Sequence, residues 1–425
     1  MQSARNRFML VAGVVALAYL FVGALSAAMA ASDTQAIAVW LASGVSFGAM
    51  LASSASHRTA VVTGTAVATV LWGAIGHALP WNAAIAFGLI EAGSIVLGTW
   101  VASRANVDRP LQQVTLLVLG ACVTGISGAT LANELWRWQY PEQLVSSNEW
   151  RAWAFSTIVG ILLVAPVIGA FKGFAIKRSG GMPMKQFGAG AAMFALFLVT
   201  TLIVFNRGVD ARFGEIAPTL AYLPMPFLLL ASMFWGPRGG SLATLVGAVL
   251  IIGLTARGGG PFAVSEAFAG EAVIEVQAYV CVWAVLLLAG RALNEARRMA
   301  LIDAREWQLR YERTLLATGM ASVEFDPVTG AAVWGESAEA VLGKDAVQLR
   351  NIRDWLDRVV MRDRPLAQAG WDAVASGRHD GSAGTCDIRL DGRELHVHTR
   401  FASVHGPDGA VERVVCLIRA EAHHA

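Results

Sequence analysis

Charged residues are scarce in this chain of 425 residues, at 15% of the sequence, whereas 55% of its residues are hydrophobic. Soluble globular domains carry about a quarter of charged residues. The shortage is concentrated in residues 1–290, while residues 291–425 contain Arg, Asp and Glu at ordinary frequency. The formal net charge of +2 is too small to indicate a nucleic-acid partner. The composition therefore predicts a membrane region followed by a soluble region.

Cysteine is also rare, and the spacing of the four cysteines includes no CxxC or CxxxC pair (Cys122, Cys281, Cys386 and Cys416). Two of them lie in apolar segments and two in predicted strands. The sequence therefore indicates neither a disulfide framework nor a zinc site. We expect all four side chains to be buried and to pack as small hydrophobic groups.

The membrane region contains about ten apolar segments of roughly the 20 residues that a transmembrane helix needs. They are residues 8–30, 36–53, 59–79, 82–102, 112–133, 150–171, 187–205, 217–235, 239–256 and 271–290. The second and ninth are short, which is also compatible with re-entrant segments. The first is longer than the apolar core of a signal peptide, so we interpret it as an uncleaved span. The fold class predicted for residues 1–290 is a polytopic α-helical membrane bundle.

Basic residues in the connections orient these segments. With ten spans and an inner N-terminus, the inner connections hold ten basic residues (Arg5, Arg7, Arg58, Arg104, Arg109, Lys172, Lys177, Arg178, Lys185 and Arg238). The outer connections hold five (Arg137, Arg151, Arg207, Arg212 and Arg257). Because positive charge is enriched in cytoplasmic loops, we expect both termini in the cytoplasm.

Four polar side chains stand within the predicted spans or at their ends: Glu91, Glu134, Glu275 and Gln277. An ionisable group at membrane depth is costly and usually faces a cavity or a partner. We therefore take these four as candidate intramembrane sensing residues, with Glu91 nearest to the middle of a span. For Glu134 and Glu275, a carboxylate that reaches the interface is an equal alternative.

Five short motifs in the membrane region resemble a known family. They are Trp40-Leu-Ala-Ser-Gly44, Asp108-Arg-Pro-Leu111, Trp150-Arg-Ala-Trp153, Phe234-Trp-Gly-Pro-Arg238 and Gly258-Gly-Gly-Pro-Phe262. Their order and spacing over residues 8–295 resemble the membrane-associated sensor (MASE) domain of the first class. Where that family has two prolines, this chain has Leu41 and Ala42. The resemblance implies a sensory module of the bacterial inner membrane, usually joined to a histidine kinase or a diguanylate cyclase.

Residues 291–316 form a linker that is rich in helix formers and contains neither Gly nor Pro. Apolar residues recur at a spacing of three and four (Leu293, Ala300, Ala304, Trp307 and Tyr311), although Arg297 occupies one position of this seam. The pattern predicts a signalling helix continuous with the last span, with Arg291, Ala300, Trp307 and Tyr311 as candidate relay residues. It is also compatible with a parallel dimeric coil. A solvated helix that folds back on the next domain is the alternative.

Residues 317–425 change to the pattern of short strands. Two strands around 321–334, helical stretches at 336–342, 350–360 and 363–376, and strands at 385–390, 393–401 and 411–419 are separated by turn signals such as Asp391-Gly392. This order, together with Glu324-Phe-Asp-Pro-Val-Thr-Gly330 and Leu356–Arg364, resembles a PAS domain. The predicted second domain is an α/β PAS domain with an antiparallel sheet.

No cofactor can be assigned to this domain from its sequence. It has no Asn-Cys-Arg-Phe-Leu-Gln flavin motif and no histidine in the helical stretches where haem-binding relatives place an axial ligand. His396 and His398 project from one face of a strand, an arrangement compatible with a metal. Because no third ligand is apparent, we favour a solvent-facing pair. The sequence supplies no argument for His423 and His424.

The soluble region also lacks the motifs of common output enzymes. It contains no GGDEF or EAL motif, no kinase phosphoacceptor helix and no Gly-rich ATP lid. No nucleophile, base and orienting group can be assembled from it. We therefore expect a non-enzymatic membrane sensor that acts as a homodimer or by association with an output kinase or cyclase, with a small-molecule ligand as one kind of stimulus. Two alternatives stay open: a transporter-like protein with a regulatory PAS tail, and a truncated cyclase or kinase.

Overall fold

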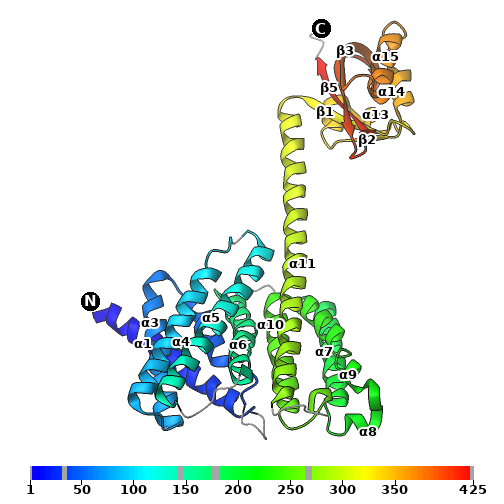
Figure 1. The fold of residues 1–425 in the computed structure, drawn as a ribbon. Helices are drawn as coiled ribbons and strands as arrows, with labels where there is room; N and C mark the ends of the chain where they lie inside the picture. Colours follow the sequence, from blue (N-terminus) through cyan, green and yellow to red (C-terminus); the bar gives the residue numbers. More distant parts are fainter. Residues whose placement is uncertain are drawn as a thin grey trace. The chain divides into compact units, whose positions relative to one another are not determined.

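The structure is a computed structural model that describes residues 2–30, 36–106, 108–141, 147–173, 182–263 and 270–421. The chain divides into two compact units, Met1–Arg297 and Arg298–Ala425. The first is helical and the second contains a β-sheet (Figure 1). Lys177, Arg178, His423 and His424 lie outside the described residues.

The helical unit is built from α1 to α10 and the first part of α11. The helices are α1 (Gln2–Ala27), α2 (Leu41–Ala52), α3 (Ala55–Leu71), α4 (Trp81–Ala102), α5 (Pro110–Gln139), α6 (Ser147–Phe171), α7 (Met184–Val204), α8 (Val209–Phe213), α9 (Ala217–Leu220), α10 (Met225–Thr255) and α11 (Glu271–Ala317). Among the described residues, eight helical segments are long and apolar enough to cross a membrane, and α2 is a shorter apolar helix. The polytopic membrane bundle predicted from the sequence is confirmed.

The difference between eight and about ten arises at α2 and α10. The helix α2 has 12 residues. The helix α10 contains most of the predicted segments 217–235 and 239–256, which meet at Gly236 (φ 66°, ψ −162°). A Cβ atom on Gly247 would lie 3.3 Å from Cδ2 of Leu228, whereas a straight helix would separate these residues by about 28 Å. The two halves of α10 therefore run antiparallel, and the turn uses a backbone conformation that glycine adopts readily.

Hydrogen bonds at the two ends of the bundle show which helix ends lie on the same side. At one end, Nε of Arg238 donates to the Ala170 carbonyl at 3.1 Å, and Nη1 of Arg291 donates to the Pro237 carbonyl at 3.2 Å. At the other end, Nε of Arg207 donates to the Arg257 carbonyl at 2.9 Å. The end of α6, the turn of α10 and the middle of α11 are thus gathered at one end.

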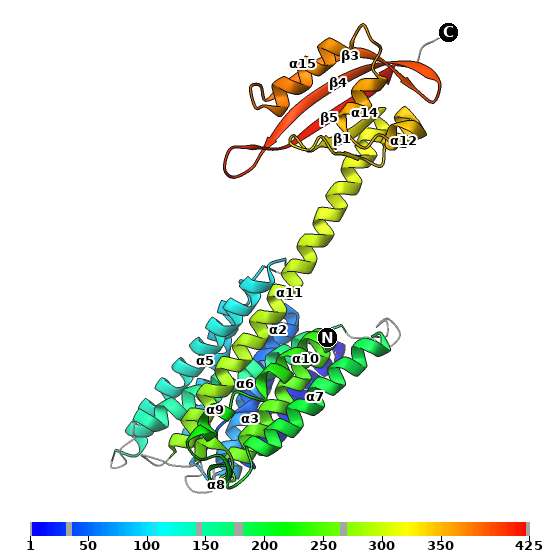
Figure 2. The same cartoon turned by 90° about the vertical axis from the view of Figure 1, so that its right-hand side faces the viewer.

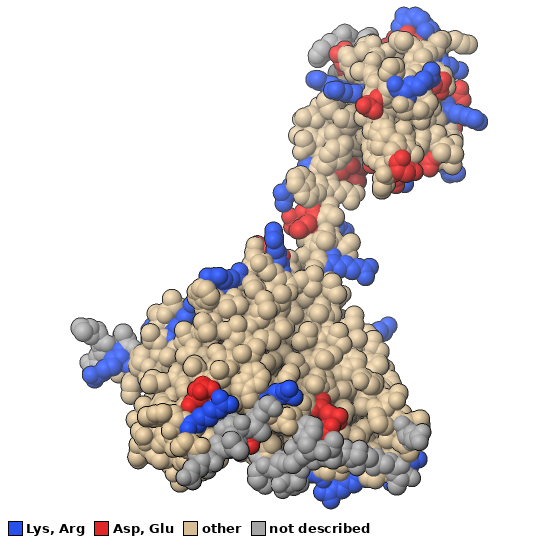
Figure 3. Space-filling view, viewed as in Figure 1, with Lys and Arg blue, Asp and Glu red and all other residues tan. Residues whose placement is uncertain are grey.

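The surface of the bundle is apolar around its middle. Figure 3 shows Lys, Arg, Asp and Glu side chains near the two ends of the bundle, with a band between them that carries neither charge in this view. An apolar band bordered by charged rims fits a lipid bilayer, which solvates apolar side chains and excludes charged ones.

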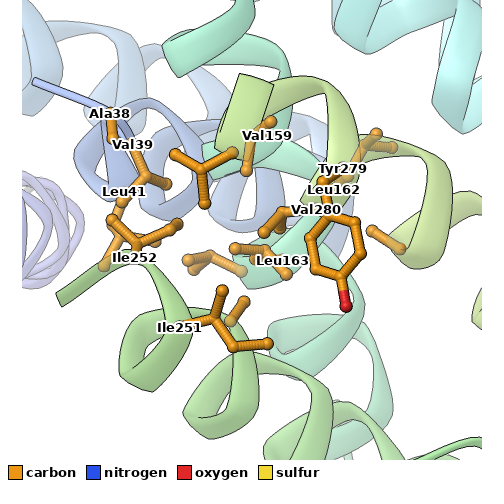
Figure 4. Packing of buried hydrophobic residues seen from close by; sticks show 14 of the residues in the cluster. Ala38, Val39, Leu41, Val159, Leu162, Leu163, Ile251, Ile252, Tyr279 and Val280 are labelled. Atoms are coloured by element: carbon orange, nitrogen blue, oxygen red, sulfur yellow. The ribbon is translucent and has the colours of Figure 1, made fainter. Parts of the chain in front are cut away.

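Small residues allow the central helices to approach each other closely. A Cβ atom on Gly44 of α2 would clash with the carbonyl oxygen of Gly160 of α6, and one on Gly48 would lie 2.8 Å from Cδ1 of Ile168. Large aliphatic side chains fill the rest of this interior, among them Leu41, Leu162 and Ile251 (Figure 4). Close backbone approach is the usual way in which membrane helices gain packing energy.

The second unit has the strand order expected of a PAS domain. Its antiparallel sheet runs β2-β1-β5-β4-β3 (Figure 2). The strands are β1 (Met320–Phe325), β2 (Ala332–Trp334), β3 (Gly381–Leu390), β4 (Arg393–His405) and β5 (Val411–Glu421). Between β2 and β3 lie α12 (Ala338–Leu342), α13 (Lys344–Val347), α14 (Ile352–Arg358) and α15 (Arg364–Ala375). The predicted fold class is confirmed, with a fourth short helix that the sequence did not reveal.

One face of this sheet packs against the helices. Trp371 of α15 makes edge contacts with Phe325 and Phe401 at ring-centroid distances of 5.4 and 6.2 Å. Cys386 and Cys416 are buried in the same core, as expected, and burial raises the pKa of the Cys386 thiol to about 11. The cysteines of the membrane region, Cys122 and Cys281, are only half-buried.

Candidate functional site

A polar cluster surrounds Glu91 inside the bundle. The hydroxyl of Ser43 donates to Oε1 of Glu91 at 2.5 Å, and the Tyr19 hydroxyl lies close to the same carboxyl group. The indole Nε1 of Trp40 donates to the Tyr19 hydroxyl at 3.2 Å. Ser43 and Tyr19 are buried. Residues of α1, the start of α2 and α4 therefore meet at one carboxyl group.

The motif Trp40–Gly44 holds this cluster in place. The backbone N–H of Trp40 donates to the Ser156 carbonyl of α6 at 3.0 Å, and the indole ring lies between Tyr19 and Trp72, at 6.1 and 5.5 Å. Gly44 brings α2 against α6. The motif thus fixes the position of Ser43, and its Trp40 ring holds Tyr19 near Glu91.

Leu41 shows what replaces the proline of the related motif. It occupies the first position of α2, where a proline would be tolerated. Its N–H donates to Oγ of Ser26 at 3.0 Å, and proline has no N–H with which to make this bond. In this chain the hydrogen bond ties the start of α2 to the end of α1.

The arrangement makes Glu91 a group that can change partners. A carboxyl group in the membrane interior needs donors or a cation, because its desolvation is costly. Its partners are hydroxyl groups, and no Lys or Arg of the described residues acts on it. A ligand cation, or a change in protonation, would compete with Ser43 and Tyr19 for the carboxyl oxygens.

Gln277 is buried, whereas Glu91 is half-buried. Its Nε2 donates to the Ala152 carbonyl of α6 at 2.9 Å. Its Oε1 is buried and has no hydrogen-bond partner among the described residues. An unpaired buried acceptor is uncommon and indicates a place where a donor from a ligand or a water molecule would bind favourably.

The other two predicted sensing residues lie at the surface. Glu134 forms an ion pair with Arg137 at 2.8 Å, one turn along α5, and both side chains are more than half exposed. Glu275 is exposed on α11. The structure therefore does not bring the four candidates together, and for Glu134 it favours the interfacial alternative.

The uncharged partners of Glu91 were missed by sequence reasoning. Ser and Tyr hydroxyl groups carry no charge, so Ser43 and Tyr19 do not stand out in an apolar segment. The one feature of the sequence that points to Ser43 is its position within the Trp40–Gly44 motif. A search for hydroxyl side chains around the motif would have found it.

The linker residues lie along a single helix. Arg291 contacts the turn of α10, as described above, while Ala300, Trp307 and Tyr311 are exposed. Residues 300–311 are all exposed, so this stretch does not fold back on the sheet. Near its end, Glu312 accepts a hydrogen bond from the N–H of Ser337 at 3.1 Å. The structure thus favours the continuous helix over the folded-back alternative.

A double-mutant cycle tests the Ser43–Glu91 contact. We expect Ser43→Ala and Glu91→Gln each to lower the thermal stability of the detergent-solubilised protein, and the double variant to lose less than the sum. The coupling energy should be about 1 kcal/mol, within the range of interhelical hydrogen bonds in membranes. Ser103→Ala, at the end of α4, is the matched control, because its hydroxyl donates to the Trp100 carbonyl of the same helix and to no other described residue. Additive losses would show that the contact contributes nothing.

Comparisons with known proteins give one family and two solved structures. The MASE1 family matches residues 9–298. A domain of a histidine kinase from Haloarcula marismortui is 18% identical, covering 24% of this chain and 88% of that one, with a TM-score of 0.21. A sensory box histidine kinase/response regulator from Burkholderia thailandensis E264 is also 18% identical, covering 26% of this chain and 83% of that one, with a TM-score of 0.22.

No curated protein matches the chain. The PAS-like character of the second unit rests on its strand order and on the helices between β2 and β3. The family match covers more than half of the chain and includes every helix from α2 to α10. The chain belongs to the MASE1 family and carries a PAS-like domain after its membrane unit.

Proposed function

We propose that this protein is a sensor of the bacterial inner membrane that detects a stimulus in its helical unit and passes it through α11 to the PAS-like domain. The PAS-like domain would then report to a separate output protein. The observation that carries this proposal is the continuity of α11, which runs from Glu271 to Ala317 without a break. Membership of the MASE1 family supports the assignment to a sensory membrane protein.

Two anchored ends make α11 suitable as a relay. Near its start, Gln277 is tied to the Ala152 carbonyl of α6. Near its end, Glu312 is tied to the N–H of Ser337, and Leu315 is buried. Between these ends, residues 291–316 contain no Gly or Pro that would let the helix bend freely. A rotation or shift of the helix at one end would therefore be felt at the other.

The orientation of the protein follows from its basic residues. Arg238 and Arg291 lie at the end of the bundle opposite to Arg207 and Arg257. The predicted excess of basic residues is on the side of Arg238. The positive-inside rule then supports a cytoplasmic location for both termini and for the PAS-like domain.

The exposed seam of α11 supports association with a second helix. Ala300, Trp307 and Tyr311 are spaced by seven and four residues and are exposed. Trp307 is 69% exposed, which is unusual for so large an apolar side chain. We propose that this seam pairs in parallel with a second copy of the chain or with a related kinase or cyclase.

Replacing residues 298–311 by a Gly-Ser sequence of equal length tests the relay. In the full-length protein in nanodiscs, we expect Glu91→Gln to change amide hydrogen exchange in β1 to β5, because the relay reports a changed bundle. With the Gly-Ser linker, Glu91→Gln should leave the sheet unaffected. Glu134→Gln is the matched control, because Glu134 is exposed on α5. An equal response of the sheet with both linkers would contradict the relay.

Capture of partners from native membranes tests the output. The proposal expects a kinase or a cyclase to be enriched with the tagged full-length protein, and less so when Trp307 and Tyr311 are both changed to Gln. Substrate flux in proteoliposomes would instead favour the transporter-like alternative.

A further inference from the structure

Three side chains with metal-binding groups meet on the outer face of the PAS-like sheet. They are His396 and His398 of β4 and Glu421 of β5, and their ligand atoms all lie within 4.8 Å of one another. The strand geometry explains this. Val397 between the two histidines is buried in the core, so both imidazoles point to the opposite face. Glu421 is the direct partner of His396 in the register of β4 and β5.

We propose that His396, His398 and Glu421 bind one divalent transition-metal ion, such as Zn²⁺ or Ni²⁺. Two imidazoles and a carboxylate are a donor set that these ions use in proteins. Tetrahedral coordination at about 2.0–2.1 Å places ligand atoms about 3.3 Å apart. Modest rotation of exposed side chains brings the three groups to that separation. A fourth position is left for a water molecule or for a ligand from outside.

The existing hydrogen bonds already orient this set. Nε2 of His398 lies 2.9 Å from Oε1 of Glu421, so a metal ion would replace the proton that these two atoms share. Nδ1 of His396 lies 2.6 Å from Oδ1 of Asp387 on β3. A carboxylate that accepts from Nδ1 leaves Nε2 with a lone pair for a metal, which is the usual support behind a metal-binding histidine. Asp387 is therefore a positioning residue.

Two arginine side chains near the site lower its expected affinity for a metal ion. Arg362 bonds to Oδ2 of Asp387 at 2.9 Å, and Arg419 lies directly opposite His398 in the register. Both charges oppose the arrival of a divalent cation. We therefore expect selectivity for ions that bind imidazole strongly, and no binding of Mg²⁺ or Ca²⁺, which prefer oxygen ligands.

The site is accessible from solvent. The side chains of His396, His398 and Glu421 are 34%, 46% and 58% exposed. An ion can thus reach them without unfolding of the sheet. Since the site joins β4 and β5, binding would raise the stability of the PAS-like domain by mass action. This inference does not depend on the relay through α11.

The test uses the full-length protein in detergent, without a polyhistidine tag and stripped of metals with a chelator. Co²⁺ is titrated and its d–d absorption is followed, and Zn²⁺ is then titrated against a chromophoric chelator. We expect one equivalent of each ion to bind and Mg²⁺ not to compete. His396→Gln and His398→Gln should each weaken binding by about 100-fold, and Asp387→Asn by about 10-fold.

Two controls separate this site from other histidines. His405→Gln changes an exposed histidine at the end of the same strand and should bind the metal as the unchanged protein does. The double variant of the tail histidines, His423→Gln with His424→Gln, should also retain binding. Thermal unfolding without metal verifies that each variant is folded. Unchanged affinity in His396→Gln and His398→Gln, or loss of binding in the tail variant alone, would overturn the proposal.

Discussion

Gly160→Ala will destabilise the membrane bundle, although it adds a single methyl group. A Cβ atom at this position would clash with the carbonyl oxygen of Trp40, and α2 lies against α6 through the reciprocal contact of Gly44. The backbone cannot yield as a flexible side chain would. Overpacking of a close contact costs about 1–3 kcal/mol. We expect a clear drop in the thermal unfolding temperature of the protein in detergent.

The effect should extend to the polar cluster. Displacement of Trp40 also moves the start of α2, and with it the hydroxyl of Ser43 that donates to Glu91. The control is Gly169→Ala on the same helix, because a Cβ atom there would have no neighbour within 4 Å. This control should keep its stability, since alanine is the better helix former. If the two variants unfold alike, the α2–α6 contact is not tight.

The extent of the membrane helices was predictable because the bilayer sets their length. A run of about 20 apolar residues is a strong signal, and it placed α4, α6 and α7 within a few residues. The turn in α10 was also visible, because Gly236 and Pro237 interrupt the apolar run. The sequence did not show that its two halves lie side by side. That arrangement depends on contacts such as Leu228 with Gly247.

The candidate site was only half predictable for a related reason. Glu91 stands out as a charge in an apolar segment, whereas its partners are uncharged and come from other helices. Which hydroxyl groups reach the carboxyl depends on the packing of α1, α2 and α4, and no local pattern encodes that. Glu134 is an equally conspicuous charge, but it lies at the surface beside Arg137, as the interfacial alternative expects.

The third residue of the proposed metal site was missed because the last strand is two residues longer than the sequence predicted. The sequence predicted the last strand to end at Arg419, but β5 continues to Glu421. Only that extension brings Glu421 opposite His396. Strand ends are the least certain part of a prediction from sequence, because the pairing partner decides where a strand stops. A third ligand was therefore present in the sequence and could not be recognised there.

Leu356→Ala is expected to destabilise the PAS-like domain strongly. Leu356 lies on α14, is 6% exposed and belongs to the core beside Trp355. Truncation of a buried leucine removes its transfer energy and leaves a cavity, at a cost of about 2–5 kcal/mol. This loss is a large part of the free energy of unfolding of a typical domain, which is about 5–15 kcal/mol. Amide hydrogen exchange of β1 and β5 in the full-length protein measures the loss.

Leu366→Ala is the matched control, because Leu366 lies on the neighbouring helix α15 and is 70% exposed. Its removal should change stability by no more than about 0.5 kcal/mol. If exchange in the sheet is equally slow in both variants, Leu356 is not part of the core.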